Sequence, residues 1–399
     1  MEFITRTIIA NSQGPAINGK IQIFESYINI FLLAAIFGLN TSMLKFINLN
    51  STKMKLKNVF TTILGINFII SIFISFFIYI LVKFFIFKGQ IELINAFSCF
   101  IFVLPFFSIT SFSQGTYVHF LIGRGEIKIS SKYKLIASSI LYVFLTLVTL
   151  IFGFKGYYFT YFIYIIISIF PCIFLFKNYI DLSLFVNVIF SFKTWINNKY
   201  IKFAFPAFIA NCLSLLITNV DVILLSVNNI SVNKIGVYSV AILISRGVLI
   251  IPMGYLQSNF SKINYKISED RSLYITLYKK EIRNLIIIML PITIILILIS
   301  NIMTNILFND TYSNSVDITR LLMISTFFQS LGMVAGNIFL ILEKVKVNLY
   351  LNIIRLVLTL LFSYLFLMKF SISGLAFSGI LTNMIFVVIQ GLIIRRVKI

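Results

Sequence analysis

The sequence predicts an all-α membrane protein that crosses the bilayer many times, on two observations. Of its 399 residues, 59% are apolar and only 11% are charged, and the mean hydropathy is +1.02; a soluble domain carries about 25% charged residues. Apolar runs of about 20 residues, the length that spans a membrane, follow one another along almost the whole chain. A soluble core cannot bury this much apolar surface, so the excess must face lipid.

The apolar runs define eleven complete spans. They cover approximately 21–44, 59–87, 93–123, 133–154, 156–177, 201–226, 235–258, 283–308, 315–341, 344–368 and 372–394. The first residues, 1–12, are also apolar, but at about 1.5 Å per residue they cross only about half of a 30 Å hydrocarbon core. We therefore expect an N-terminal helical stub before the eleven spans.

Basic residues divide unevenly between the two sides of the membrane. The formal net charge is +21, with 23 of the 33 basic residues in connections on one side and eight on the other. By the positive-inside rule, the richer side, which includes the C-terminus, is cytoplasmic. Because these residues set orientation, they do not indicate a nucleic-acid partner. The abundance of Phe, Ile, Asn and Lys hints at an AT-rich bacterial genome, so we expect a multi-pass membrane protein of a bacterium.

The chain contains two similar halves. A shift of about 217 residues brings together three pairs of glycines: Gly19 with Gly236, Gly38 with a position near Gly254, and Gly156 with a position within one residue of Gly374. Parallel repeats of this kind, related by an axis along the membrane normal, are typical of transporters.

The repeat also predicts the domain organisation. We expect an N-terminal lobe at 1–177, a cytoplasmic linker at 178–200 and a C-terminal lobe at 201–399. The counterpart of the first span of the second half would begin about 17 residues before Met1. The first helix of the N-terminal lobe is therefore expected to be truncated, through either a misassigned start or a short first half.

Polar side chains recur at helical spacing on three apolar spans of the second half. Asn348, Asn352, Arg355, Thr359 and Ser363 share one face of 344–368; Asn211, Ser214, Thr218 and Asp221 share one face of 201–226; and Ser239, Arg246 and Gln257 lie on 235–258. Spacings of three and four residues keep side chains on one helical face. These stripes predict a polar cavity lined by Arg246, Arg355, Asp221, Asn211, Thr218, Asn352, Thr359 and Gln257.

Three stretches of the sequence carry a resemblance to a known family. They are QGPAINGKIQIF…FGLNTSMLKF at 13–46, FAFPAFIANCLSLLITNVDVILLS…IGVYSVA at 203–241 and SISGLAFSGILTN at 371–383. They resemble the polysaccharide flippases (O-antigen, Wzx type) of the superfamily that also holds multidrug extruders and the lipid II flippase. The resemblance implies two six-helix lobes around a cavity that opens alternately to each face. It also implies that the cargo is a short sugar repeat, of O-antigen or capsule, on undecaprenyl pyrophosphate.

The charged residues inside the spans carry the expected chemistry. Arg246 and Arg355 lie near mid-span, where a charge is costly and usually faces a cavity or a partner, and guanidinium groups bind phosphate bidentately. We expect both to line the cavity and attract the pyrophosphate; alternatively, one pairs with Asp221 as a structural link. Asp221 either balances Arg246 or binds a coupling proton or sodium ion. Glu25, near the outer end of its span, is expected to be solvated at the interface.

These observations favour a transporter over an enzyme. We expect it to act as a monomer among membrane lipids, without a cofactor or bound metal. The alternatives are a cation-coupled multidrug exporter or a lipid II flippase of the same fold, and then a membrane sugar polymerase or acyltransferase. The connections on the external side are too short for such an enzyme, and no catalytic constellation is apparent. Two arginines against one aspartate favour an anionic cargo over an organic cation.

Overall fold

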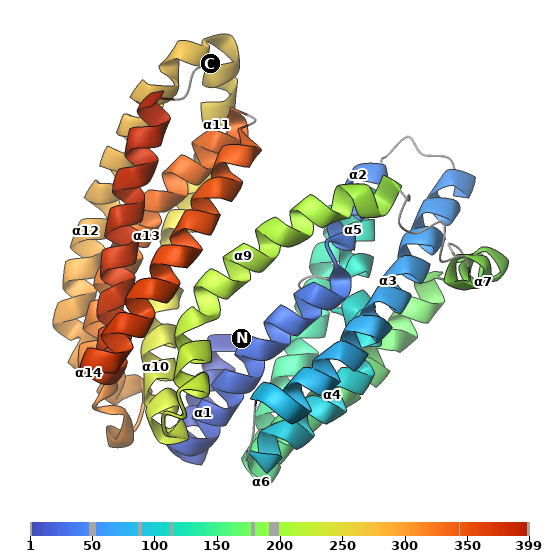
Figure 1. Cartoon of the computed structure of the whole chain (residues 1–399), viewed down its shortest axis with the longest axis horizontal. Helices are drawn as coiled ribbons and strands as arrows, with labels where there is room; N and C mark the ends of the chain where they lie inside the picture. The colour runs from blue at the N-terminus through green and yellow to red at the C-terminus, as the bar shows by residue number, and fades with distance from the viewer. Residues whose placement is uncertain are drawn as a thin grey trace. The chain divides into compact units, whose positions relative to one another are not determined.

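The structure is a computed structural model that describes residues 2–47, 53–86, 90–111, 115–176, 180–190, 199–342 and 344–396. Within these ranges every regular element is a helix (Figure 1). The predicted all-α fold class is therefore confirmed. Residues 178, 179 and 191–198 of the predicted linker lie outside the described residues.

The helices of the first half cover the predicted spans, but the predicted span 21–44 is divided between two helices, and so is the predicted span 93–123. In order they are α1 (Glu2–Ile36), α2 (Leu39–Phe46), α3 (Lys53–Leu81), the π-helical η1 (Val82–Ile86), α4 (Ile91–Thr110), α5 (Thr116–Gly123), α6 (Ile127–Phe176) and α7 (Leu182–Phe190). The second half contains α9 (Lys199–Val227), α10 (Val232–Val248), α11 (Ile250–Glu269), η2 (Arg271–Leu273), α12 (Tyr274–Leu307), η3 (Asp310–Tyr312), α13 (Ser315–Ile341) and α14 (Val345–Arg396).

Nine helices among the described residues are long and apolar enough to cross a membrane. Two of them, α6 and α14, hold 50 and 52 residues, about twice the length that a 30 Å core requires. Each is kinked at one residue with positive φ, Gly153 (59°) and Ser371 (54°). Each therefore supplies two spans, which gives the eleven predicted. A further kink at Gly14 (φ 74°) separates residues 2–13 from the rest of α1, and this short piece is the predicted stub.

The kinks also reproduce the internal repeat in the backbone. Gly153 and Ser371 are 218 positions apart, close to the shift read from the sequence. Three residues beyond each kink, Gly156 and Gly374 pack against the carbonyl oxygens of Val148 and Phe366, so closely that a Cβ would overlap them. Only a residue without a side chain permits this approach.

One predicted pair of equivalent glycines is not equivalent in conformation. Gly38 has a left-handed backbone (φ 70°) between α1 and α2, whereas Gly254 lies inside α11. The break in the second half falls instead at Leu249, between α10 and α11. The match of Gly38 with Gly254 is therefore wrong as a structural equivalence.

The surface of α12 shows the polarity expected of a membrane span. Ile287, Leu298 and Ile306 are 64%, 73% and 77% exposed, whereas Thr293, Ser300 and Thr304 are buried. Two of these hydroxyl groups are satisfied locally, because Ser300 and Thr304 donate to backbone carbonyls of their own helix. Apolar groups outside and polar groups inside are stable only where the surrounding solvent is hydrocarbon.

The chain forms two compact units. Unit 1 comprises Met1–Gln13 and Ile23–Leu215, and unit 2 comprises Gly14–Gln22 and Leu216–Ile399. The division falls within α1 and α9 because parts of both helices pack on the other half's elements. The start of α9, for example, lies against α2 in unit 1, where the Ser42 hydroxyl donates to the Tyr200 carbonyl at 2.8 Å. The predicted lobe boundaries at 177 and 201 remain predictions.

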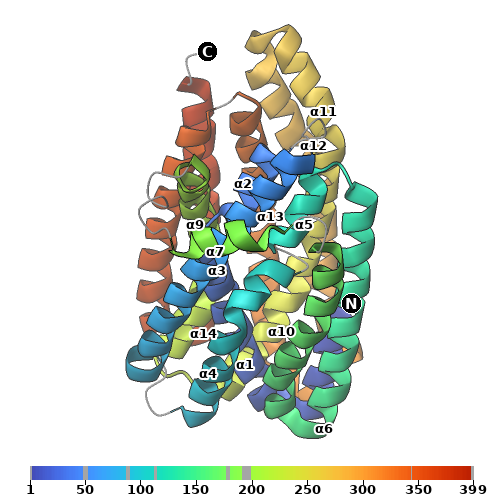
Figure 2. The same cartoon turned by 90° about the vertical axis from the view of Figure 1, so that its right-hand side faces the viewer.

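Unit 1 is built around aliphatic and aromatic side chains from α2, α3, α5 and the start of α9. Phe60 of α3 and Phe120 of α5 are fully buried, with ring centroids 4.2 Å apart. The short helix α7 packs on α3 at Gly65, which Val188 and Phe185 approach closely. The two views in Figures 1 and 2 agree that α3 and α4 run side by side.

Asp181 begins α7 in the predicted linker. Its carboxylate accepts hydrogen bonds from the Ser183 hydroxyl at 2.7 Å and the Leu184 amide at 3.3 Å, and Lys57 lies 3.3 Å away. These hydrogen bonds, first that of Ser183 and then that of Leu184, together with Lys57, lower the pKa of Asp181 to about 2. The side chain is therefore a charged N-cap at any physiological pH.

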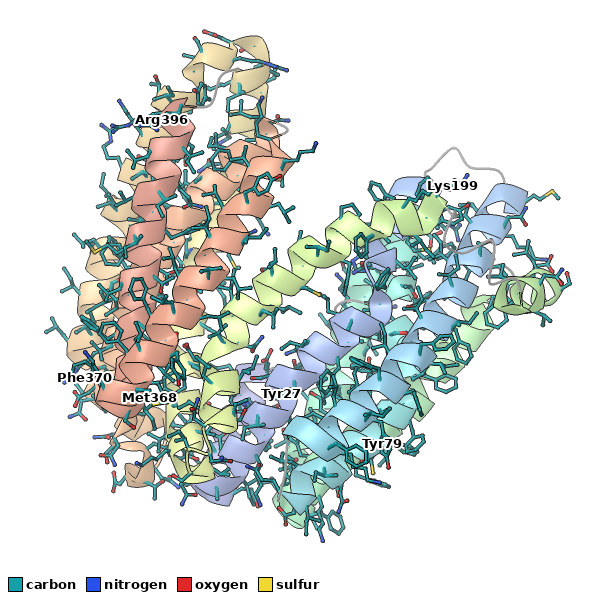
Figure 3. The ribbon with its side chains drawn as sticks, viewed as in Figure 1. Tyr27, Tyr79, Lys199, Met368, Phe370 and Arg396 are labelled. Atoms are coloured by element: carbon teal, nitrogen blue, oxygen red, sulfur yellow. The ribbon has the colours of Figure 1, made fainter. Side chains whose placement is uncertain are left out.

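Unit 2 is organised around α13, which packs against α10, α12 and α14. Leu285, Met289, Leu331 and Val334 form part of one core cluster, and Tyr274, Ile338 and Ile394 belong to another nearer the C-terminal end. In Figure 3, Arg396 lies at one end of this unit, and Met368 and Phe370 lie at the opposite end.

A segment of α1 completes unit 2. Residues Gly14–Gln22 pack on α10, where Gly19 contacts the backbone at Val232 and Gly236, and Gly236 contacts the carbonyl of Pro15. Asn18 donates to the Gly236 carbonyl at 3.1 Å and to the Ser239 hydroxyl at 2.7 Å. The two glycines that the repeat makes equivalent, Gly19 and Gly236, therefore touch each other.

Candidate functional site

Unit 2 contains a polar cavity of about 370 Å³ between α9, α10, α13 and α14. Five of the eight predicted cavity residues line it: Thr218, Asp221, Arg246, Arg355 and Thr359. The rest of the lining is Ile217, Ile242, Ser245, Leu249, Met253, Leu322, Ser325, Thr326, Gln329, Gly379, Thr382 and Asn383. The cavity thus contains two cations, one anion and several hydroxyl and amide groups. Formally, its charge is positive.

Arg355 is held rigidly at the wall of the cavity. Its Nη2 donates to the Asn383 side-chain oxygen at 2.8 Å, and its guanidinium lies 5.1 Å from the centre of the Phe386 ring. Asn383 is itself fixed, because its amide nitrogen donates to the Ser325 hydroxyl at 3.0 Å. Arg355 Nε is buried without a hydrogen-bond acceptor, and no carboxylate of a described residue forms an ion pair with this arginine.

Arg246 reaches the same cavity from near the end of α10. Its Nη2 donates to the backbone carbonyl of Thr218 on α9, and its side chain is exposed. The guanidinium therefore joins α9 to α10 through a main-chain acceptor. It lines the same cavity as Asp221, in keeping with a role in charge balance.

Asp221 is surrounded by hydroxyl donors. The Tyr238 hydroxyl donates to its Oδ2 at 2.6 Å, and the Ser363 hydroxyl lies 3.5 Å from its Oδ1. Ser363 in turn lies 3.0 Å from the hydroxyl of Ser378. Both uses considered for this carboxylate, balancing Arg246 and binding a coupling cation, are compatible with this arrangement.

The structure does not bring the other three predicted residues to this cavity. Asn211 belongs to unit 1 because the division of α9 follows Leu215. Gln257 is exposed beyond the break at Leu249, which ends the helical register on which its predicted alignment with Arg246 depended. Asn352 lies one turn before Arg355 on α14 and is absent from the lining. Their roles remain predictions.

The sequence reasoning missed polar lining residues on α13 and on the second span of α14. They are Ser325, Thr326 and Gln329, together with Thr382 and Asn383. The signal was present, since Ser325 and Gln329 are four residues apart, as are Ser378 and Thr382. Asn383, the residue that fixes Arg355, follows directly in the stretch that carried the family resemblance.

A second charged cluster lies in unit 1. Arg6 Nη2 and Glu25 Oε2 are 3.3 Å apart, with only 6% and 18% of their side chains exposed. The Tyr157 hydroxyl of α6 also donates to Glu25. The expectation that Glu25 is solvated at the interface is therefore wrong, because Arg6, from the stub before the Gly14 kink, reaches and covers it.

The Arg6–Glu25 pair should be important for stability. Removing one partner leaves the other charge buried, which costs about 3–5 kcal/mol, whereas an apolar pair of similar volume restores most of the loss. We expect Glu25→Gln and Arg6→Ala each to lower the thermal unfolding midpoint of the purified protein markedly, and Arg6→Met with Glu25→Leu to recover it. A double variant as unstable as the sum of the single variants would contradict this account.

Comparisons with known proteins give the fold. No family model and no curated protein matches the sequence. Among solved structures, 98% of the chain matches 93% of an inward-facing multidrug resistance MATE family transporter of the MOP superfamily, with a TM-score of 0.79 and 16% identity. For the lipid II flippase MurJ in an inward closed conformation, the coverages are 99% and 85%, the TM-score 0.78 and the identity 15%.

A third match is a MOP superfamily transporter from Pyrococcus furiosus Vc1 (DSM3638), whose reversed binding-pocket polarity suggests a different function. The match covers 98% of this chain and 90% of the Pyrococcus furiosus transporter, with a TM-score of 0.63 and 18% identity. All three neighbours are membrane transporters. The chain therefore has the fold of the MOP superfamily transporters.

Proposed function

We propose that this protein moves an undecaprenyl-pyrophosphate-linked oligosaccharide, an O-antigen or capsule repeat unit, across a bacterial inner membrane by alternating access. The MOP fold, the family resemblance of three stretches and the positively charged cavity all support this proposal. The two helical lobes would open the path to one face of the membrane and then the other. The protein itself supplies no bond chemistry.

The observation that carries the proposal is Arg355. A cation inside a membrane span costs several kcal/mol unless it faces water or a counter-charge. Arg355 faces the cavity, and no described carboxylate neutralises it. Its guanidinium lines the cavity, and its buried Nε is without an acceptor, so a small shift of the side chain would offer an unused donor to an anionic group. A diphosphate matches this need, because a guanidinium presents parallel N–H groups to two oxygens.

The rest of the lining suits a hydrated headgroup. Ser245, Thr326, Gln329 and Thr382 offer hydroxyl and amide groups that replace part of the water a sugar diphosphate loses on leaving the aqueous phase. Without such partners, each polar group transferred to an apolar medium costs several kcal/mol. Asp221 then serves either as the counter-charge of Arg246 or as the site of a coupling proton or sodium ion.

Two alternatives use the same fold. A cation-coupled multidrug exporter would be expected to present an acidic cavity, whereas this one contains two arginines and one aspartate. A lipid II flippase shares the diphosphate-lipid chemistry with the proposed cargo, so Arg355 does not separate these two. The nature of the sugar decides between them.

Complementation tests the proposal against both alternatives. The gene would be expressed in three bacterial strains: one lacking its O-antigen flippase, one depleted of its lipid II flippase and one lacking its main drug exporter. We expect surface glycan to return in the first strain, and neither viability in the second nor drug resistance in the third. Rescue of viability or resistance alone would replace the proposal with the corresponding alternative.

The proposed orientation has its own test. We propose that the C-terminus lies in the cytoplasm, as the distribution of basic residues indicates. A C-terminal alkaline phosphatase fusion should therefore be inactive, and a C-terminal green fluorescent protein fusion should fluoresce. The opposite pair of results would reverse the topology.

A further inference from the structure

A second cavity of unit 2 lies away from the proposed transport site, on the outer face of α12 and the end of α14. It has a volume of about 370 Å³. Its lining consists of Ile275, Tyr278, Lys279, Ile282, Arg283, Ile286 and Ile287 of α12, and Val387, Gly391 and Arg395 of α14. We call this feature the α12–α14 groove.

One end of the groove, which we call its rim, is basic. Lys279 and Arg283 are four residues apart and therefore share one face of α12, and Arg395 approaches them from α14. All three side chains are exposed, and none forms an ion pair with a described residue. The Tyr278 hydroxyl adds a hydrogen-bond donor beside Gly391.

The floor of the groove is apolar and continues along the membrane span. Ile282, Ile286, Ile287 and Val387 form it, and the exposed Leu290 and Ile294 extend the same surface down α12. The basic rim lies at the end of unit 2 that carries Arg396, and Phe370 lies at the far end (Figure 3). The groove therefore runs from a charged end of the unit toward the hydrocarbon region.

We propose that the α12–α14 groove binds an anionic phospholipid, such as phosphatidylglycerol, from the leaflet on the basic side of the protein. Lys279, Arg283, Arg395 and the Tyr278 hydroxyl hold the phosphate, and the acyl chains lie on the isoleucine floor. Basic pockets between transmembrane helices select such headgroups. A soluble phosphate would bind the basic side chains of the rim but would make no contact with the apolar floor. A ligand that uses both the basic rim and the apolar floor is a lipid with an anionic headgroup.

Native mass spectrometry of the purified full-length protein tests this site. We expect phosphatidylglycerol to bind at least tenfold more tightly than phosphatidylcholine. The triple variant Lys279→Gln, Arg283→Gln and Arg395→Gln should abolish that preference. A control with the same loss of charge at the same end of the unit, Lys262→Gln, Lys266→Gln and Arg271→Gln, lies outside the groove lining and should retain it. Equal affinities for the two lipids, or equal loss in both triple variants, would overturn the proposal.

Filling the groove tests the site without a change of charge. A Cβ at Gly391 would lie 3.6 Å from the Tyr278 hydroxyl, so Gly391→Ala should fit, whereas Gly391→Leu should occupy the groove and weaken phosphatidylglycerol binding at least tenfold. Undiminished binding in a monodisperse Gly391→Leu protein would contradict the site. Inorganic phosphate at millimolar concentration is expected not to displace the lipid, and full displacement would identify a soluble phosphate as the ligand.

Discussion

Replacing Arg355 with methionine is expected to weaken binding of undecaprenyl pyrophosphate by about 10- to 100-fold. A charge-assisted hydrogen bond contributes about 1.5–3 kcal/mol, and each 1.4 kcal/mol is a factor of ten. Arg355→Lys should fall in between, because lysine keeps the charge but not the paired donors. The dissociation constant of the purified protein for the diphosphate lipid, measured by thermophoresis in detergent, gives the effect. Lys346→Met, on the exposed start of the same helix, is the matched control and should bind normally.

Stability separates a binding role of Arg355 from a structural one. Replacing an uncompensated buried charge with an apolar side chain of similar volume is often neutral or stabilising. We therefore expect Arg355→Met to keep or raise the unfolding midpoint while it loses affinity. If stability and affinity fall together, the arginine is a structural link through Asn383 and not a ligand for the cargo.

Replacing Gly236 with alanine is expected to destabilise unit 2 by about 3 kcal/mol or more. A Cβ at this position would overlap the carbonyl oxygen of Pro15, and its nearest neighbours are all backbone atoms that cannot rotate away. Overpacking alone costs about 1–3 kcal/mol, and displacement of the segment would also strain the two hydrogen bonds of Asn18. Thermal unfolding in detergent should show a large fall in the midpoint.

The control for Gly236 lies on the same helix. A Cβ at Gly247 would meet no atom within 4 Å, so Gly247→Ala should stabilise α10 by about 0.5–1 kcal/mol through helix propensity. The two Gly→Ala changes are therefore expected to act in opposite directions. Similar effects of both would show that the contact between Gly236 and Pro15 is not tight in the folded protein.

Much of the fold could be predicted because lipid imposes a simple pattern on the sequence. The lengths of the apolar runs predicted the spans, including both spans of α6 and of α14. The repeat paired Gly19 with Gly236, but similarity alone could not reveal that these glycines touch. The kink at Ser371 could not be predicted from the sequence either, because serine rarely adopts a positive φ and does not by itself indicate a turn.

The candidate site was predictable where it depended on helical spacing. Thr218 and Asp221 share a face of α9, Arg355 and Thr359 share a face of α14, and all four line the cavity. Asn211 and Asn352, from the same two stripes, do not line it. Helical spacing did not place Gln257 correctly, because the break at Leu249 interrupts the helix between Arg246 and Gln257. The sequence also could not predict the hydrogen-bond partner of Arg246. The acceptor is a backbone carbonyl, and because every residue has a backbone carbonyl, no sequence pattern marks this one.

The most direct test of the proposed transport is flipping of a defined cargo by the purified protein in sealed liposomes. Undecaprenyl-pyrophosphate oligosaccharide would be placed in the membrane, and its appearance on the opposite face would be followed with a membrane-impermeant glycosidase. The wild-type protein should expose the sugar on the opposite face, whereas Arg355→Met should not, and neither protein should move a neutral polyprenyl glycoside that lacks the diphosphate. Equal movement of the neutral lipid, or a wild-type rate in Arg355→Met, would contradict recognition of the cargo by its diphosphate.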